Sequence, residues 1–515
     1  MMHRSPLRLA LAASLLGPAV MHAQQSSATT PPSSGAPMAL SLDEALRLAL
    51  NSSESVAIAR AGEQRSRGQL GQARSTLLPQ IGTTLNWQKQ LQNQFAAITK
   101  RANNGSSGDN GSGSDTTSGS NPTASITRIF ASEYNFNLGI TATQPIYTGG
   151  RATANIRAAR AGRDAAEIGI TSAQAQVLLD VTQAYYDALL SDRLLTIADS
   201  TLVQAERALR QVQLTRSVGS ASEFELIRAR VTRDNQRPGW LQARTARELA
   251  YVRLRQLLNL SEDRVVSLTD SIAETALAPS SAAAAPVTSV NVAAADVLTI
   301  DPSVQSQVAR TLGVADTTVQ RRAPVRQALL GVEVAKQQLR ASKAQRIPTI
   351  GATSTYQRLA YPTNVLPKSL ADFFPNWTVG IGLSYPLFTG GRVRGEILAA
   401  EASVADAKQR LKLAEEGAAL DARASALRLT EAEAAWQASV GTAEQAQRAY
   451  EIAEVRFREG ISTQLELSET RVQLQQALAN RARAARDLQV ARKRLELLRD
   501  LPLSSGSTTS TGFNP

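Results

Sequence analysis

The hydrophobic pattern of this 515-residue chain switches between two periods. In four segments apolar and polar residues alternate: about 80–92, 131–145, 349–358 and 376–386. In the second segment, for example, Tyr134, Phe136 and Leu138 alternate with Asn135 and Asn137. A period of two is typical of a strand with one apolar and one polar face. The sequence therefore predicts four amphipathic strands.

The rest of the pattern has the period of a helix. From Val181 to Val212, apolar and small residues recur at spacings of three and four, which is a heptad seam. Four long helices are expected, at about 151–218, 222–260, 392–459 and 463–500. A helix from Arg151 to Ser217 would be about 100 Å long at 1.5 Å per residue. Such helices are far longer than those of an ordinary globular domain.

Two local signals refine the helices. Ser41 followed by Glu44 forms a capping box, so a helix should begin there and run to about Leu78, before Pro79. In the first returning helix, Pro238 precedes Gly239, and we expect a kink or an interruption at this point.

The chain is an internal duplication. Thr-Gly-Gly-Arg occurs at Thr148–Arg151 and again at Thr389–Arg392, a spacing of 241 residues. Gly219 and Gly460, which should end the two longest helices, have the same spacing. A fixed period indicates a repeated structural unit. We assign the first repeat to 40–265, the second to 324–501, and an inter-repeat segment to 266–323.

The segments outside the repeats have distinct compositions. Residues 1–23 resemble an export signal, with basic residues before a short apolar run and Ala23 at the expected cleavage site. Residues 24–39 are linker-like, 103–120 form a Gly/Ser-rich loop, and 502–515 form a tail that we expect to be disordered. No apolar run is long enough for a membrane-spanning helix.

Composition excludes several chemistries. The chain has no cysteine, and both of its histidines lie within 1–23. We therefore expect no catalytic residues, no cofactor and no metal site, since the usual thiol, imidazole and zinc chemistry has no side chains to use. The net charge is +12, but basic residues are interspersed with acidic ones and form no tract. Nucleic-acid binding is not expected.

Four strands cannot close a barrel, and open sheet edges cannot lie in hydrocarbon. Membrane barrels begin at about eight strands. The strands must therefore lie in water or be completed by further copies of the chain. Two copies would supply eight strands and three copies twelve.

The signal, the duplication, the aromatic residue before Thr-Gly-Gly-Arg and the glycine-centred turns together resemble the TolC-like outer-membrane efflux protein family. The resemblance implies a mainly α fold with a transmembrane β-barrel. In such proteins, duplicated helix–strand–strand–helix units form a homotrimer with a twelve-stranded barrel and a long α-helical periplasmic tunnel. It also implies a location in the outer membrane of a Gram-negative bacterium, in contact with outer-membrane lipid and extending into the periplasm.

The function that the resemblance implies is a passive exit duct of a tripartite efflux or type I secretion system. Its partners would be a periplasmic adaptor (a membrane fusion protein) and an inner-membrane pump of RND, ABC or MFS type. Two alternatives remain open at this stage: a periplasmic coiled-coil scaffold or adaptor without a channel, and an exported carboxylate-dependent enzyme such as a glycosidase.

The resemblance also assigns candidate sites by position. The glycine-centred turns would be the periplasmic tips that contact the adaptor: Val218, Gly219, Ser220, Ala221 and Ser222, and Glu459, Gly460, Ile461, Ser462 and Thr463. Acidic residues six and nine places after the second tip glycine would form a tunnel constriction, here Glu466 and Glu469. Glu225, the third candidate for the constriction, and Arg228 hold the matching positions in the first repeat, and Thr463 stands where a basic latch residue is expected.

Aromatic residues on or beside the strands could form belts at the membrane interface. They are Trp87, Tyr134, Phe136, Tyr356, Trp377 and Tyr385. The same residues could instead pack within a soluble sheet.

Overall fold

The computed structural model describes residues 38–91, 134–271 except 262, part of 304–310, and 317–503 except a few positions between 363 and 372. The expected signal, the Gly/Ser-rich loop and nearly all of the linker lie outside these residues, as do most of the inter-repeat segment and of the tail.

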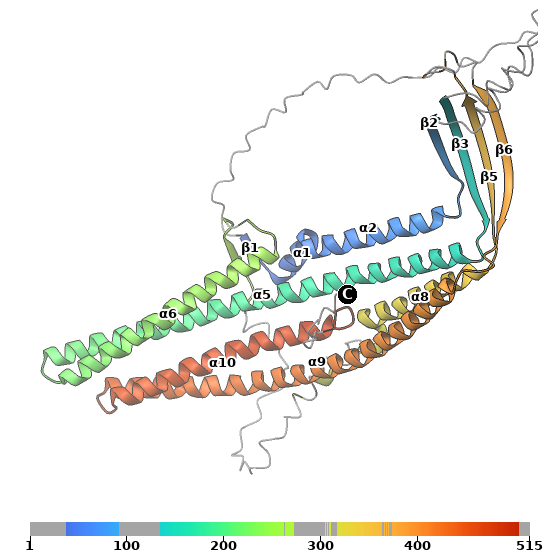
Figure 1. Cartoon of the computed structure of the whole chain (residues 1–515). Helices are drawn as coiled ribbons and strands as arrows, with labels where there is room; N and C mark the ends of the chain where they lie inside the picture. Colours follow the sequence, from blue (N-terminus) through green and yellow to red (C-terminus); the bar gives the residue numbers. More distant parts are fainter. Residues whose placement is uncertain are drawn as a thin grey trace, which may run out of the picture.

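A four-stranded antiparallel sheet lies at one end of the molecule (Figure 1). Its strands are β2 (Gln80–Lys89), β3 (Tyr134–Tyr147), β5 (Thr349–Ala360) and β6 (Phe374–Ser384), in the order β2-β3-β5-β6. The two hairpins of the two repeats therefore join edge to edge between β3 and β5, and β2 and β6 are the outer strands.

The register sorts side chains by polarity. Leu85 lies opposite Leu138, and Ile140 lies opposite Tyr356, which in turn lies opposite Trp377. These apolar residues share one face, while threonine, asparagine and glycine occupy the other. Every residue of β2 and β6 is exposed in the single chain. The predicted amphipathic strands are thus present, with their apolar face uncovered.

The Thr-Gly-Gly-Arg motif makes the turn from strand to helix in both repeats. Gly149 and Gly150 have φ of 64° and 87°, and Gly390 and Gly391 have φ of 59° and 88°. Two consecutive residues in the left-handed region strongly favour glycine, which has no Cβ to clash. The second glycine of each pair is the N-cap of the long helix that follows.

Two helical hairpins form the body. The long helices α5 (Arg151–Ser217) and α9 (Arg392–Arg458) each have 67 residues and return as α6 (Glu223–Leu257) and α10 (Gln464–Glu496). The shorter helices α2 (Glu54–Ser75) and α8 (Ala323–Lys343) lie along the long helices on the side toward the sheet (Figure 1). Among the described residues, none of the helices is both long and apolar enough to cross a bilayer.

One expectation about helix breaks is wrong, and of the kink or interruption expected at Pro238 the interruption does not occur. The helix expected from Ser41 to about Leu78 is divided into α1 (Leu42–Ser52) and α2, because Ser53 is extended at ψ 124° and caps the second helix by accepting from Val56 N. Conversely, α6 runs through Pro238 without interruption. The stretch around Pro238 is exposed, so water can satisfy the Asp234 carbonyl that proline leaves without a donor.

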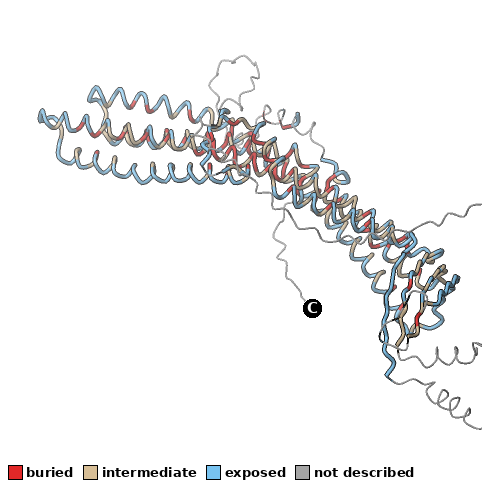
Figure 2. The backbone as a smooth tube through the Cα atoms, turned by 90° about the horizontal axis from the view of Figure 1, so that it is seen from above, coloured by how far each residue is buried: buried red, intermediate tan, exposed pale blue. Residues whose placement is uncertain are grey.

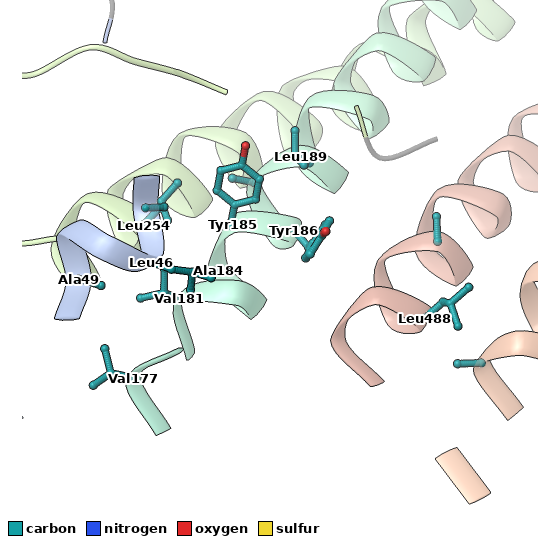
Figure 3. Close-up of a cluster of buried hydrophobic side chains, with 14 of the residues drawn as sticks. Leu46, Ala49, Val177, Val181, Ala184, Tyr185, Tyr186, Leu189, Leu254 and Leu488 are labelled. Atoms are coloured by element: carbon teal, nitrogen blue, oxygen red, sulfur yellow. The ribbon is translucent and has the colours of Figure 1, made fainter. Parts of the chain in front are cut away.

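Buried positions are concentrated in the middle of the helical body (Figure 2). Among the described residues, the largest buried cluster is formed by α1, α5, α6, α9 and α10 (Figure 3). Tyr185, fully buried, is near its centre, with Leu46, Leu254 and Leu488 in the same cluster. Its hydroxyl donates to Asp270 Oδ2 at 2.8 Å. Beside this cluster, β1 (Met38–Leu40) pairs in parallel with β4 (Val266–Leu268), a two-stranded sheet that the sequence pattern does not reveal.

Candidate tunnel tips and membrane face

The first tip joins α5 to α6 at the end of the body far from the sheet (Figure 1). Gly219 has φ 81°, and Ser220 N donates to Thr215 O at 2.9 Å, which satisfies a carbonyl at the end of α5. Ser222 then starts α6 in a capping box: Ser222 N donates to Glu225 Oε2 at 3.1 Å, and Glu225 N donates to Ser222 Oγ at 3.2 Å. The turn is fixed by its own backbone and caps.

The second tip has the same construction with different side chains. Gly460 has φ 74°, and Ile461 N donates to Arg456 O at 2.9 Å. Thr463 is the N-cap of α10 and accepts from Glu466 N at 3.3 Å. Both tips therefore place a left-handed glycine two residues after the end of the long helix.

Both tips expose apolar side chains to solvent. Val218 is 75% exposed in the first tip, and Ile461 is 70% exposed in the second. Phe224, in the first turn of α6, is similarly exposed. Ala221 differs, because it packs against the hairpin core formed by Leu209, Val212 and Ala229. Each tip thus combines a rigid turn with an apolar side chain that the single chain leaves uncovered.

Two of the three predicted constriction carboxylates have partners within their own hairpin. Glu225 accepts within the capping box described above. Glu466 Oε1 accepts from Arg456 Nη1 at 2.9 Å, and its Oε2 accepts from Ser462 Oγ at 2.6 Å. Glu469 is exposed. The role of Arg456 was missed from the sequence, although its place four residues before Gly460 puts it at the turn.

Most of the predicted interface aromatics lie at one end of the sheet. Trp87, Tyr134, Phe136 and Trp377 are close to the strand ends that lead to the loops, and the rings of Trp87 and Tyr134 stack at 6.2 Å between centroids. Trp377 Nε1 donates to Ser354 Oγ at 3.1 Å.

The opposite end of the sheet carries a second aromatic group. Tyr385 is exposed there, and so are Tyr147 and Phe388, which the sequence prediction omitted. Their signal was present, since each of these two directly precedes a Thr-Gly-Gly-Arg motif.

Comparison with known families decides the identity. A family model described as outer membrane efflux protein matches residues 45–260 and 314–499, which together make up most of the chain. The chain belongs to the outer membrane efflux protein family. The resemblance drawn from the repeat and its turns is thereby confirmed. Members of this family are channels that work as trimers with adaptor and pump partners, rather than enzymes.

Solved structures show the same fold. The outer membrane channel CmeC of Campylobacter jejuni is 14% identical, with a TM-score of 0.67 over 90% of this chain and 86% of that chain. The outer membrane protein VceC of Vibrio cholerae is 17% identical, with a TM-score of 0.65 over 89% and 95%. The open state of the MtrE channel of Neisseria gonorrhoeae is 16% identical, with a TM-score of 0.61 over 90% and 89%. No match was found among curated proteins.

The expected fold class and location are confirmed by these comparisons. This outer membrane efflux protein lies in the outer membrane of a Gram-negative bacterium and extends into the periplasm. The sheet, with its uncovered apolar face, is the part of the chain suited to lipid.

Proposed function

We propose that three copies of this chain form an exit duct through the outer membrane and periplasm. The observation that carries the proposal is the four-stranded sheet, which has one mostly apolar face and two outer strands, β2 and β6, each paired on one edge alone among the described residues. In lipid, such strands are stable only in a closed barrel. Because an even number of strands leaves β2 and β6 antiparallel when copies meet side by side, whole copies can close a barrel. Three copies, the number in which members of this family work, would supply twelve strands.

The dimensions agree with a membrane barrel. Trp377 and Tyr385 are eight residues apart, which is about 27 Å along an extended chain. The apolar band of outer-membrane barrels is about 25 Å tall and is flanked by aromatic girdles. The proposed belts are therefore Trp87, Tyr134, Phe136, Tyr356 and Trp377 toward the loops, and Tyr385 toward the helices.

The helical hairpins would line the periplasmic part of the duct. Their tips, 218–222 and 459–463, would contact a periplasmic adaptor, and the exposed side chains of Val218 and Ile461 support this role. An inner-membrane pump would supply the energy, within a tripartite efflux or type I secretion system. The duct itself carries out no chemistry and is proposed to be passive.

Near the tips, carboxylates would surround the narrow end of the bore. Three copies of Glu466 and Glu469 supply six carboxylates, and a ring of acids attracts cations and controls selectivity. Glu466 is paired with Arg456 in its own hairpin. Glu469 is therefore the more effective member of the proposed ring.

The need for detergent in extraction and the native mass of the protein together distinguish the proposed duct from a coiled-coil scaffold. The protein should fractionate with the outer membrane, require detergent for extraction, and give a native mass of three chains. A coiled-coil scaffold would be released without detergent, and a water-soluble protein of any stoichiometry would contradict the proposed duct.

A further inference from the structure

The four described strands of the large sheet contain only two charged residues, and both are cations. Lys89 is the last residue of β2, and Arg358 lies near the end of β5. These strands contain no aspartate and no glutamate. In a barrel with a water-filled interior, a charged strand residue is expected on the polar face, where water solvates it. The two cations are on the other face.

Both cations lie on the apolar face, just beyond aromatic residues of the proposed belt. Side chains alternate between the two faces of a strand, so Lys89 shares the face of Trp87, two residues before it. In the same way, Arg358 shares the face of Tyr356. In each strand the cation is therefore the next residue on that face toward the loops. Both cations are exposed.

The two cations occupy the same position in the two repeats. Strands β2 and β5 start 269 residues apart, and the same spacing separates Lys89 from Arg358. It also separates Trp87 from Tyr356. One repeat has tryptophan and lysine at these two positions, and the other has tyrosine and arginine. Because the residue types differ while the chemistry is the same, the common feature is a positive charge beyond an aromatic ring.

Aromatic side chains of the same face contact both cations. Lys89 Nζ lies 5.5 Å from the centroid of the Tyr134 ring, and Arg358 Nε donates to Tyr356 Oη at 3.2 Å. The face of an aromatic ring attracts a cation, and a neutral phenol accepts a hydrogen bond. Neither of these contacts supplies a negative charge. They hold the two cations beside rings that suit the level of lipid headgroups.

The register puts Arg358 outside the apolar band. Arg358 pairs with Pro375, which is two residues beyond Trp377 on β6. Trp377 and Tyr385 mark the two proposed belts, and the apolar band of an outer-membrane barrel lies between its belts. Near the interface, a cation on the lipid face costs little, whereas at the middle of the bilayer it is strongly unfavourable. Arg358 is thus placed among headgroups rather than acyl chains.

We infer that Lys89 and Arg358 bind the phosphate of an anionic lipid headgroup, in the leaflet on the loop side of the outer membrane. The inference rests on the proposed function, which turns the apolar face toward lipid. A headgroup phosphate supplies the complementary charge. The acyl chains attached to it would lie on exposed apolar side chains of the same face, such as Leu85 and Val379, which a free phosphate could not use. Three copies would present six such cations around the barrel.

Tryptophan fluorescence can report this binding, because Trp87 and Trp377 lie on the apolar face near the two cations and bromine on a lipid chain quenches them. Detergent-solubilised trimer is titrated with brominated phosphatidic acid or with brominated phosphatidylcholine, whose headgroup has no net charge. The native protein should be quenched at about fivefold lower concentrations of phosphatidic acid, since one cation near an anionic lipid surface contributes about 1 kcal/mol. Lys89→Gln with Arg358→Gln should abolish this difference.

Two matched controls separate headgroup binding from a general effect of charge. Lys89→Arg with Arg358→Lys keeps both charges and should keep the preference for phosphatidic acid. Arg210→Gln with Arg230→Gln removes the same charge from exposed positions of the first helical hairpin and should also keep it. Inorganic phosphate at the same concentration should not displace the brominated phosphatidic acid.

Four results would overturn the inference: no preference in the native protein, a preference that survives both glutamine substitutions, an equal loss in the Arg210/Arg230 control, or displacement of the lipid by inorganic phosphate. Each of them leaves the proposed duct in place as long as the preparation is trimeric and conducts ions. A protein that is soluble without detergent would overturn both the duct and the lipid contact.

Discussion

Asp180 and Asp421 occupy the same position in the two repeats, but only Asp421 lies between two arginines. Its Oδ2 accepts from Arg322 Nη2 at 2.8 Å, and its Oδ1 accepts from Arg494 Nη2 at 3.1 Å. Arg322 is fully buried and also donates to the Ala418 carbonyl. This network connects the start of α8 with α9 and α10. In the first repeat, Ser53 stands at the position of Arg322.

Asp421→Asn should destabilise the helical body strongly. The substitution would leave two arginine charges in the interior without a carboxylate, which costs about 3–5 kcal/mol when one partner of a buried pair is removed. The temperature at which the trimer loses its helical circular dichroism should fall clearly.

Asp180→Asn is the matched control, and it should not destabilise the helical body. Burial raises the pKa of Asp180, against the lowering effects of the Gln176 hydrogen bond and the Arg253 charge. When the pKa of an acid is higher in the folded state than in the unfolded state, the free energy of unfolding rises as the pH falls through the folded-state pKa. At neutral pH the charged form of Asp180 therefore lowers stability. Asp180→Asn should therefore leave the free energy of unfolding unchanged or raise it slightly. Equal losses in both variants would contradict the assignment of the network.

Arginine substitutions on the two faces of the sheet should have very different effects on assembly. Ile381 lies on the apolar face and is 76% exposed, whereas Gly382 lies on the polar face. Ile381→Arg should cost about 2–4 kcal/mol near the middle of the bilayer. Assembly in vesicles, measured as heat-resistant trimer on a gel, should drop for Ile381→Arg. It should change little for Thr378→Arg, because Thr378 lies on the polar face that the proposed duct turns toward its bore. A reversed order would place lipid on the wrong face.

Substitutions at the two tips should impair adaptor binding and export while leaving the fold intact. Val218→Asp and Ile461→Asp each change an exposed side chain that contributes little to the hairpin core. The trimer should persist and its conductance should be unchanged, while binding of the adaptor and export in cells should fall several-fold. Normal adaptor binding by the double variant would reject the proposed contact.

The acidic ring predicts a change in ion selectivity. Removing charge with Glu469→Ala should reduce the preference for cations in reversal-potential measurements, and Glu466→Ala should also reduce it because it leaves the positive charge of Arg456 without its carboxylate partner. Glu223→Ala, which removes an exposed acid in the first turn of α6 outside the candidate constriction, is the control for loss of a tip carboxylate. Unchanged selectivity in the Glu466/Glu469 double variant would exclude the ring.

The strands and long helices were predictable from the periodicity of the sequence. Features that depend on single side chains were not. Alternation at Tyr134–Ile140 and the heptad seam after Val181 specified strands and helices, because burial of a face repeats over many residues. The break at Ser53 depends on one cap, and the continuity of α6 depends on the exposure around Pro238. The pairing of Met38–Leu40 with Val266–Leu268 joins segments more than two hundred residues apart, which no local pattern records.

The candidate sites were also predictable only in part. The two glycine turns were predictable, since a duplicated glycine that ends a heptad run requires a left-handed residue. The pairing of Glu466 with Arg456 was not, because it depends on how the turn folds back on the long helix. Whether a carboxylate faces the bore depends on the other copies, and a single sequence does not contain that geometry.

A water-filled pore enclosed by copies of this chain should be detectable by planar-bilayer recording, without any partner protein. Purified detergent-extracted protein should insert in discrete steps of ohmic conductance. Those steps should disappear for a preparation in which Ile381→Arg prevents barrel assembly. A preparation of the native chain that is trimeric and folded but gives no conductance steps, under conditions that open the tips, would contradict the account.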